Sequence, residues 1–137
     1  MSHWQSKMKL RPTDLQFSKY IRLRDGKCVF QIKCNGTNDF QGETQEDYIK
    51  RLTCSHLEGR RKESVRFDEE NCDTACRKCH QYLEEHKDEY REWKKKQLGE
   101  KRYNALIIRA NTRGHRDDVM QKIINKALLE EVKAQLS

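Results

Sequence analysis

Six cysteines constrain what this chain can fold into more than any other feature. They stand among 137 residues at positions 28, 34, 54, 72, 76 and 79. No apolar leader segment precedes them, so we expect the chain to fold in a reducing compartment. Disulfides are rare there, and metal binding explains a group of cysteines better. The sequence therefore predicts a metal site rather than a disulfide framework.

Only Cys76 and Cys79 have the two-residue gap that brings two thiolates to one tetrahedral zinc ion from a single turn. A second pair is needed, and Cys28 and Cys34 can return their sulfurs across a longer, five-residue loop. Cys54 and Cys72 are alternatives, or small buried apolar residues. We predict a structural zinc ion held by the following four residues: Cys28, Cys34, Cys76 and Cys79.

The composition makes such a metal useful. Charged residues form 37% of the chain and hydrophobic residues only 34%, which leaves little apolar surface for a large core. A structural zinc ion contributes on the order of 10 kcal/mol to folding. We therefore expect one small domain whose fold depends on metal.

The net charge of +7 points to a polyanionic partner, and nucleic acid is the first candidate. The excess of basic residues is greatest at the two ends of the chain. Charge alone does not separate DNA from RNA. Uncharged stretches fall far short of the roughly 20 residues of a membrane-spanning helix, so we expect a protein with no membrane segment.

Periodicity and turn residues predict an α+β order of short elements. Residues 1–13 form a basic arm, and Asp14 caps a helix that Gly26 ends. A loop covers 28–42. The remaining elements are strands 51–57 and 63–67 around a turn, a helix from a Thr74 cap to Gly99, and helices 100–110 and 117–136.

His56, Asn71 and His80 fall at the end of a predicted strand, in the loop after the hairpin, and in the first turns of the next helix. A hairpin followed by a helix can bring these three together. One imidazole near neutral pKa can take a proton from water while a second holds a divalent metal against a phosphate. The combination indicates phosphodiester hydrolysis.

The residues Cys54-Ser-His56, Asn71 and Cys76-Arg-Lys-Cys79-His80 resemble the HNH branch of the His-Me finger (ββα-metal) endonucleases. The resemblance covers roughly residues 15–97. A closer similarity, to phage recombination nucleases of the NinG/Rap type that act on branched DNA, runs through Ser55-His56, Arg60-Arg61, residues 64–72 and residues 99–103.

This resemblance implies a zinc-stabilised ββα-metal core with additional C-terminal helices, divided into a nuclease domain at 14–98 and a helical extension at 99–137. It implies that His56 is the general base and that Asn71 holds the loop of His56. His80 would coordinate a catalytic Mg²⁺, Mn²⁺, Ni²⁺ or Zn²⁺, giving 5′-phosphate products. The expected location is the cytoplasm of a bacterium or a phage-infected cell.

The sequence departs from the family at one metal ligand. Many members have Asp directly before the first histidine, where this chain has Ser55, a weak ligand when neutral. Glu84 lies four residues after His80, on the same helix face, and could complete the coordination, although a solvated glutamate is an equal interpretation. His80 could instead join the zinc site.

The DNA contacts expected beside the general base come from basic residues that could grip phosphates: Arg60, Arg61, Lys62, Arg66 and Arg77. The apolar face of the last helix could form a homodimer or pack on the domain. The sequence thus favours a metal-dependent DNA endonuclease. The alternatives are a non-catalytic zinc module that binds DNA or a protein, and a nuclease that acts on RNA.

Overall fold

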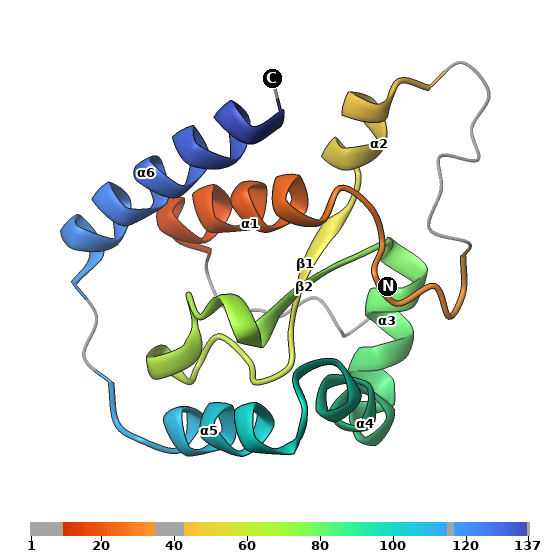
Figure 1. Ribbon diagram of the computed structural model, residues 1–137, viewed down its shortest axis with the longest axis vertical. Coiled ribbons are helices and arrows are strands. Elements are labelled where there is room, and N and C mark those ends of the chain that lie inside the picture. Colours follow the sequence, from red (N-terminus) through yellow and green to blue (C-terminus); the bar gives the residue numbers. More distant parts are fainter. Residues whose placement is uncertain (1–9, 35–42, 115–116, 137) are drawn as a thin grey trace.

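A computed structural model of the chain describes residues 10–34, 43–114 and 117–136, and it has an α+β fold (Figure 1). Residues 1–9 of the predicted basic arm (1–13) and residues 35–42 of the predicted loop lie outside the described residues. The elements are, in chain order, α1 (Pro12–Asp25), α2 (Gln45–Lys50), β1 (Thr53–His56), η1 (Glu63–Val65), η2 (Glu69–Asn71), β2 (Cys72–Ala75), α3 (Arg77–Glu85), α4 (Lys87–Leu98), α5 (Glu100–Ala110) and α6 (Asp118–Leu136).

Helix α1 begins two residues before the predicted cap. Pro12 stands in the first turn, where its missing N–H costs nothing. Asp14 lies inside the helix, and its Oδ2 accepts a hydrogen bond of 2.7 Å from the Arg11 backbone N–H. Gly26 ends the helix in the left-handed region at φ 71°, as predicted. The Asp14 carboxylate thus caps the helix N-terminus from a position inside the helix, by accepting a hydrogen bond from the backbone N–H of Arg11.

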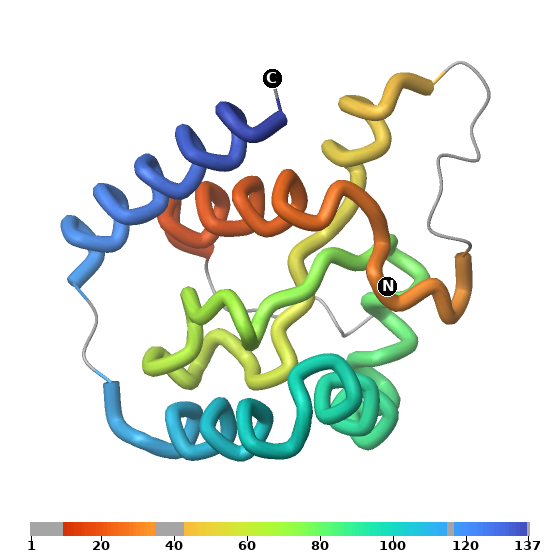
Figure 2. The backbone as a smooth tube through the Cα atoms, in the orientation of Figure 1, coloured from red at the N-terminus to blue at the C-terminus, as the bar shows by residue number. Residues whose placement is uncertain are grey.

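The two strands pair antiparallel, but the second is not the predicted one. β1 pairs with β2, and the register sets Thr53 opposite Ala75 and His56 opposite Cys72. The segment expected as a strand at 63–67 contains the 3₁₀ turn η1 instead. Val65 and Phe67, which are both buried, are two residues apart, and this spacing is the same as that of the buried side chains of a strand. The connection between the strands is therefore a long folded loop, which Figure 2 traces beside α5.

The helix predicted from Thr74 to Gly99 is two helices. Thr74 belongs to β2, and the N-cap of α3 is Cys76, whose sulfur accepts from the Cys79 N–H. The helix is interrupted at His86, whose backbone has the non-helical angles φ −131° and ψ 61°, and α4 begins at the next residue. The helix predicted at 100–110 is confirmed as α5, and α6 starts one residue later than predicted.

Two apolar clusters flank the small sheet. One joins the loop after α1 to helices α3, α4 and α5 and includes Phe30, Leu57, Val65, Leu83, Tyr90 and Leu106. The other lies under α1 and includes Phe17, Ile21, Cys54, Phe67, Cys72 and Val132. Helix α6 packs along α1 (Figure 1), where the Asn125 amide donates to the Thr13 carbonyl at 3.1 Å. The last helix therefore covers the first.

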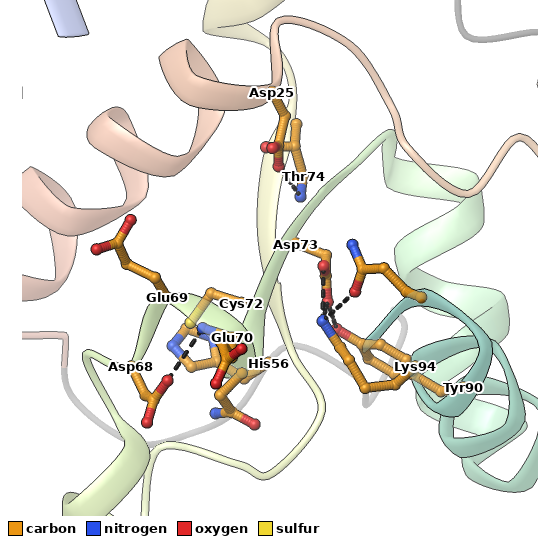
Figure 3. Close-up of polar contacts among 12 residues, drawn as sticks. Asp25, His56, Asp68, Glu69, Glu70, Cys72, Asp73, Thr74, Tyr90 and Lys94 are labelled. Atoms are coloured by element: carbon orange, nitrogen blue, oxygen red, sulfur yellow. Dashed lines mark hydrogen bonds and ion pairs between the residues drawn. The ribbon is translucent and has the colours of Figure 1, made fainter. Parts of the chain in front are cut away.

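A buried ion pair lies on the other side of the sheet (Figure 3). Lys94 of α4 is 1% exposed, and its Nζ lies 2.7 Å from Asp73 Oδ2 in β2. The Tyr90 hydroxyl donates to the same oxygen at 2.9 Å. These bonds tie α4 to β2 of the sheet.

Candidate active site and metal centre

The structure brings the four predicted zinc ligands together. The sulfurs of Cys28, Cys34, Cys76 and Cys79 all lie within 4.8 Å of one another, close enough to hold one zinc ion. Cys28 and Cys34 come from the loop after α1, and the other two stand at the start of α3. The cluster therefore joins two segments that are more than 40 residues apart.

Backbone groups support these sulfurs as acceptors. The Lys33 N–H points to Cys79 Sγ at 3.2 Å, and the Cys79 N–H points to Cys76 Sγ at 3.4 Å. Hydrogen bonds from the thiols of Cys76 and Cys79 lower the pKa of Cys28. The same hydrogen bonds to Cys28 raise the pKa values of Cys76 and Cys79. Among these three residues, the thiolate that binds zinc is therefore favoured at Cys28.

His56 ends β1 and is buried, with 6% of its surface exposed. Its Nε2 lies 3.0 Å from the carbonyl oxygen of Arg66. A carbonyl only accepts, so Nε2 carries the proton and Nδ1 carries the lone pair. Burial, followed by repulsion from the Arg60 guanidinium, lowers the pKa of His56 to about 3. The ring is therefore neutral at pH 7 and can accept a proton at Nδ1.

His80 stands in the first turn of α3, directly after Cys79. Its Nδ1 lies 2.8 Å from Thr53 Oγ1, and that hydroxyl donates its own proton to the Ala75 carbonyl at 2.8 Å. The hydroxyl must then accept from His80, so Nδ1 carries the proton and Nε2 carries the lone pair. Burial lowers the pKa of His80 to about 3. Nε2 is thus in the form that binds a metal.

Glu84 lies one turn after His80, as predicted, and its Oε1 is 3.9 Å from His80 Nε2. Two ligand atoms at this separation can share one divalent ion. Water and phosphate oxygens supply the remaining ligands in sites of this kind. His80 is not part of the four-cysteine cluster. The structure therefore keeps the candidate catalytic ligands apart from the candidate zinc ligands.

Two basic side chains border the histidines. The charge of Arg60 acts on both rings, because it contributes to lowering the pKa of His56 and that of His80. Its Nε is buried and has no hydrogen-bond partner among the described residues. Lys87 Nζ donates to the carbonyls of His56 and Leu57 at 3.2 and 3.1 Å. Each cation also faces a carboxylate, since Lys87 Nζ lies 3.2 Å from Glu84 Oε1 and Arg60 Nε lies 3.6 Å from Asp14 Oδ1.

Asn71 precedes β2 and is fully buried. Its Oδ1 accepts from the Glu58 N–H at 2.9 Å, and its Nδ2 donates to the carbonyls of Glu58 and Val65 at 2.9 and 3.1 Å. Every bond goes to the loop that follows His56. The amide therefore acts as a clamp on that loop, which is the arrangement expected for a positioning residue.

Ser55 is fully buried and pairs with Asp73 across the sheet. Side chains alternate along β1, so the side chain of Ser55 lies on the face of the sheet opposite to those of Cys54 and His56. Its hydroxyl lies near the Tyr90 phenol. Thr53, two residues before Ser55 and on the same face, contacts His80, so the expectation that Ser55 is a metal ligand stays a prediction.

The predicted DNA contacts separate into two groups. Arg66 is 2% exposed and binds Asp14 through two hydrogen bonds of 2.8 and 2.6 Å, so it is an internal residue and not a surface contact. Arg61 and Arg77 are exposed. Lys62 is half-buried and contacts Glu58. The sequence could not distinguish Arg66 because its partner lies 52 residues away.

Helix α6 exposes several large apolar side chains: Val119, Met120, Ile123, Ile124 and Leu136. Its Val132 is buried against α1, so one face packs on the domain. The homodimer stays a prediction.

Sequence reasoning missed two residues of the site. Thr53 holds the proton of His80 on Nδ1. The sequence indicated only that Thr53 lies in a strand, and nothing in it indicated this contact. Lys87 reaches back over the end of β1 because the helix breaks at His86. Neither interaction has a local sequence signature.

Comparison with known proteins gives no further assignment: no family model, no curated protein and no solved structure matches this chain. Among the described helices, none is both long and apolar enough to cross a membrane.

Proposed function

We propose that the protein is a metal-dependent DNA endonuclease of the HNH type, with a ββα core formed by β1, β2 and α3. The observation that supports the proposal is that two neutral imidazoles and one guanidinium lie near enough to influence one another electrostatically. His56 and His80 each have a fixed tautomer, and Arg60 lies close enough to influence both. An isolated DNA-binding module has no need of this arrangement.

His56 takes the proton from the attacking water. The bond from Nε2–H to the Arg66 carbonyl orients the ring and leaves Nδ1 as the acceptor. Its pKa of about 3 is low for a general base, because burial lowers it most and the charge of Arg60 lowers it further. A DNA phosphate bound to Arg60 offsets that positive charge. Substrate binding therefore raises the basicity of His56 toward the range in which proton transfer is efficient.

His80 and Glu84 are the residues that would hold the catalytic cation. A divalent ion there would stabilise the charge that develops on the phosphate and on the leaving oxygen. The donor set fits such an ion because one imidazole nitrogen and one carboxylate lie 3.9 Å apart. Mg²⁺, Mn²⁺, Ni²⁺ and Zn²⁺ all accept these ligand types. Arg60 and Lys87 hold the phosphate by charge.

A structural zinc ion on the four cysteines supports this site. Cys79 and His80 are adjacent, so a metal that fixes the start of α3 also fixes the imidazole. We infer that zinc contributes to catalysis only through folding. Replacing Cys79 by serine is then expected to remove zinc and unfold the domain, which circular dichroism and metal content measure together.

The test is cleavage of a supercoiled plasmid, a four-way DNA junction, single-stranded DNA and RNA by the zinc-loaded protein. Mg²⁺, Mn²⁺ or Ni²⁺ is added or left out, and EDTA is avoided because it would also remove structural zinc. His56→Ala is compared with His86→Ala, which removes an exposed histidine that stacks on Tyr82. Circular dichroism checks the folding of both variants.

We expect DNA cleavage that requires the added metal, is lost in His56→Ala and persists in His86→Ala. A preference for the junction over the plasmid would identify branched recombination intermediates as the substrate. DNA binding without cleavage under every metal would instead identify a zinc-containing binding module. Cleavage of RNA alone would reassign the substrate.

A further inference from the structure

A second group of soft ligands lies outside the four-cysteine cluster. Cys54 and Cys72 come from the paired strands β1 and β2, and His56 ends β1 opposite Cys72. One ligand atom from each of the three residues lies within 4.8 Å of the other two. Figure 3 shows Cys72 and His56 together at this end of the sheet. Neither cysteine has a role in the endonuclease proposed above.

The separation of these atoms suits a tetrahedral metal. Zinc–sulfur bonds of about 2.3 Å at tetrahedral angles place two sulfurs about 3.8 Å apart. The observed limit of 4.8 Å exceeds this by about 1 Å, a shift that small side-chain rotations supply. The three residues therefore need no change of backbone to reach a common ion.

His56 is already arranged as a ligand. Its Nε2–H donates to the Arg66 carbonyl, and imidazoles that bind a metal through one nitrogen usually donate the other N–H to such an acceptor. Nδ1 therefore carries the lone pair that a metal would take. In the proposed mechanism the same lone pair takes the proton of the water.

The surroundings select the kind of ion. Cys54, His56 and Cys72 are 5, 6 and 0% exposed, and Phe17, Ile21 and Phe67 pack around the two cysteines. Two thiolates cancel the charge of one divalent ion, so the filled site is neutral and tolerates apolar neighbours. Sulfur and nitrogen donors favour Zn²⁺ over Mg²⁺. A soft divalent ion fits here, and a hard one does not.

We propose that Cys54, Cys72 and His56 form a second zinc site, and that zinc bound there inhibits the enzyme by occupying Nδ1 of His56. Two thiol protons leave to solvent when the ion binds, and no electron is transferred. The inhibitory role rests on the proposed endonuclease function. The site itself does not.

Metal content tests the site without any activity measurement. The intact protein is saturated with Zn²⁺ under TCEP, passed over a desalting column and analysed for zinc by mass spectrometry. Wild type is expected to hold one more zinc ion per chain than Cys54→Ala, whatever the zinc content of the other sites. Equal zinc content in the two folded proteins overturns the proposal.

Thiol labelling covers the case in which Cys54→Ala fails to fold. Wild-type protein with one or two equivalents of Zn²⁺ is treated with iodoacetamide, and the labelled cysteines are identified by mass spectrometry. The second equivalent is expected to slow labelling of Cys54 and Cys72 by about tenfold or more. Unchanged labelling of both cysteines overturns the proposal.

Inhibition is tested by titrating Zn²⁺ into Mg²⁺-supported cleavage. Each protein is compared with its own activity before zinc is added. Wild type is expected to lose about 90% of its activity or more, and Cys54→Ala to resist at the same zinc concentration. Equal inhibition of the two proteins rejects the inhibitory role, because zinc then acts elsewhere, for example by replacing Mg²⁺ at His80. Absence of any cleavage rejects the endonuclease, while the zinc content still decides the site.

Discussion

The hydroxyl of Thr53 lies 2.8 Å from Nδ1 of His80 and donates its only proton to the Ala75 carbonyl. The first residue of β1 thereby decides which nitrogen of an imidazole on α3 bears the proton. Since Ala75 pairs with Thr53 across the sheet, the strand register and the ring tautomer depend on each other.

Replacing Thr53 by valine keeps the side-chain shape and removes the acceptor for His80. We expect the Mg²⁺ concentration needed for half-maximal cleavage to rise about 10- to 100-fold, as happens when such outer partners of metal ligands are lost. Thr53→Ser restores the hydroxyl and is expected to restore the metal dependence. Nitrogen-15 NMR of His80 should report a mixture of tautomers in Thr53→Val alone; a single unchanged tautomer would show that Thr53 does not position the ring.

Acid should destabilise the fold through its two buried histidines. Burial lowers the pKa of both His56 and His80 from 6.5 to about 3, so the unfolded chain binds more protons between these pH values. Their contribution to stability is present above pH 6.5 and is lost as the pH falls toward 3. Each histidine adds about 1.4 kcal/mol per pH unit to the slope.

Urea denaturation at several pH values between 6.5 and 4.5, without added Mg²⁺, measures this slope. His56→Gln is expected to lower it by the contribution of one histidine, about 1.4 kcal/mol per pH unit. An identical slope in wild type and His56→Gln would mean that His56 does not titrate with the predicted shift.

Asn71→Ala should destabilise the domain by about 3 kcal/mol, because it leaves three backbone groups of the following loop without their partner. Asn104→Ala serves as the control, since Asn104 is exposed on α5. Chemical denaturation gives both values. A loss of cleavage in Asn71→Ala with no loss of stability would point to direct contact with the substrate instead of a clamp.

Arg66 and Arg61 should respond oppositely although they lie five residues apart. Arg66→Ala leaves Asp14 buried without its guanidinium and should lower the free energy of unfolding by about 3–5 kcal/mol. Arg61→Ala removes an exposed charge, so stability should change by less than about 0.5 kcal/mol. In DNA binding, Arg61→Ala should reduce the slope of log affinity against log salt by about one. Equal effects on stability would contradict this division.

Local patterns in the sequence predicted several parts of the fold. Helix capping and periodicity gave α5 at its observed bounds and α6 within one residue. The ligand spacing of Cys76 and Cys79, with Cys28 and Cys34 as the second pair, predicted the four thiols that the structure brings together. These features depend on residues close in sequence, or on chemistry that few residue types possess.

The partner of β1 could not be predicted in the same way. Val65 and Phe67 alternate as in a strand, but the Asn71 side chain binds the Val65 carbonyl and holds the segment as a turn. Likewise, the break at His86 places Lys87 where it donates to the carbonyls at the end of β1, about 30 residues earlier in the chain. Each outcome depends on a partner that is distant in the chain.

The sequence by itself determined which chemical groups the protein has: four thiols spaced for zinc, the imidazoles of His56 and His80, and a net positive charge. Only the tertiary structure decided which ring nitrogen of each histidine carries the lone pair. The carbonyl of Arg66 sets the proton of His56, and the hydroxyl of Thr53 sets that of His80. The physical reason is that a ring tautomer depends on the atom opposite each nitrogen, and folding alone brings that atom into place.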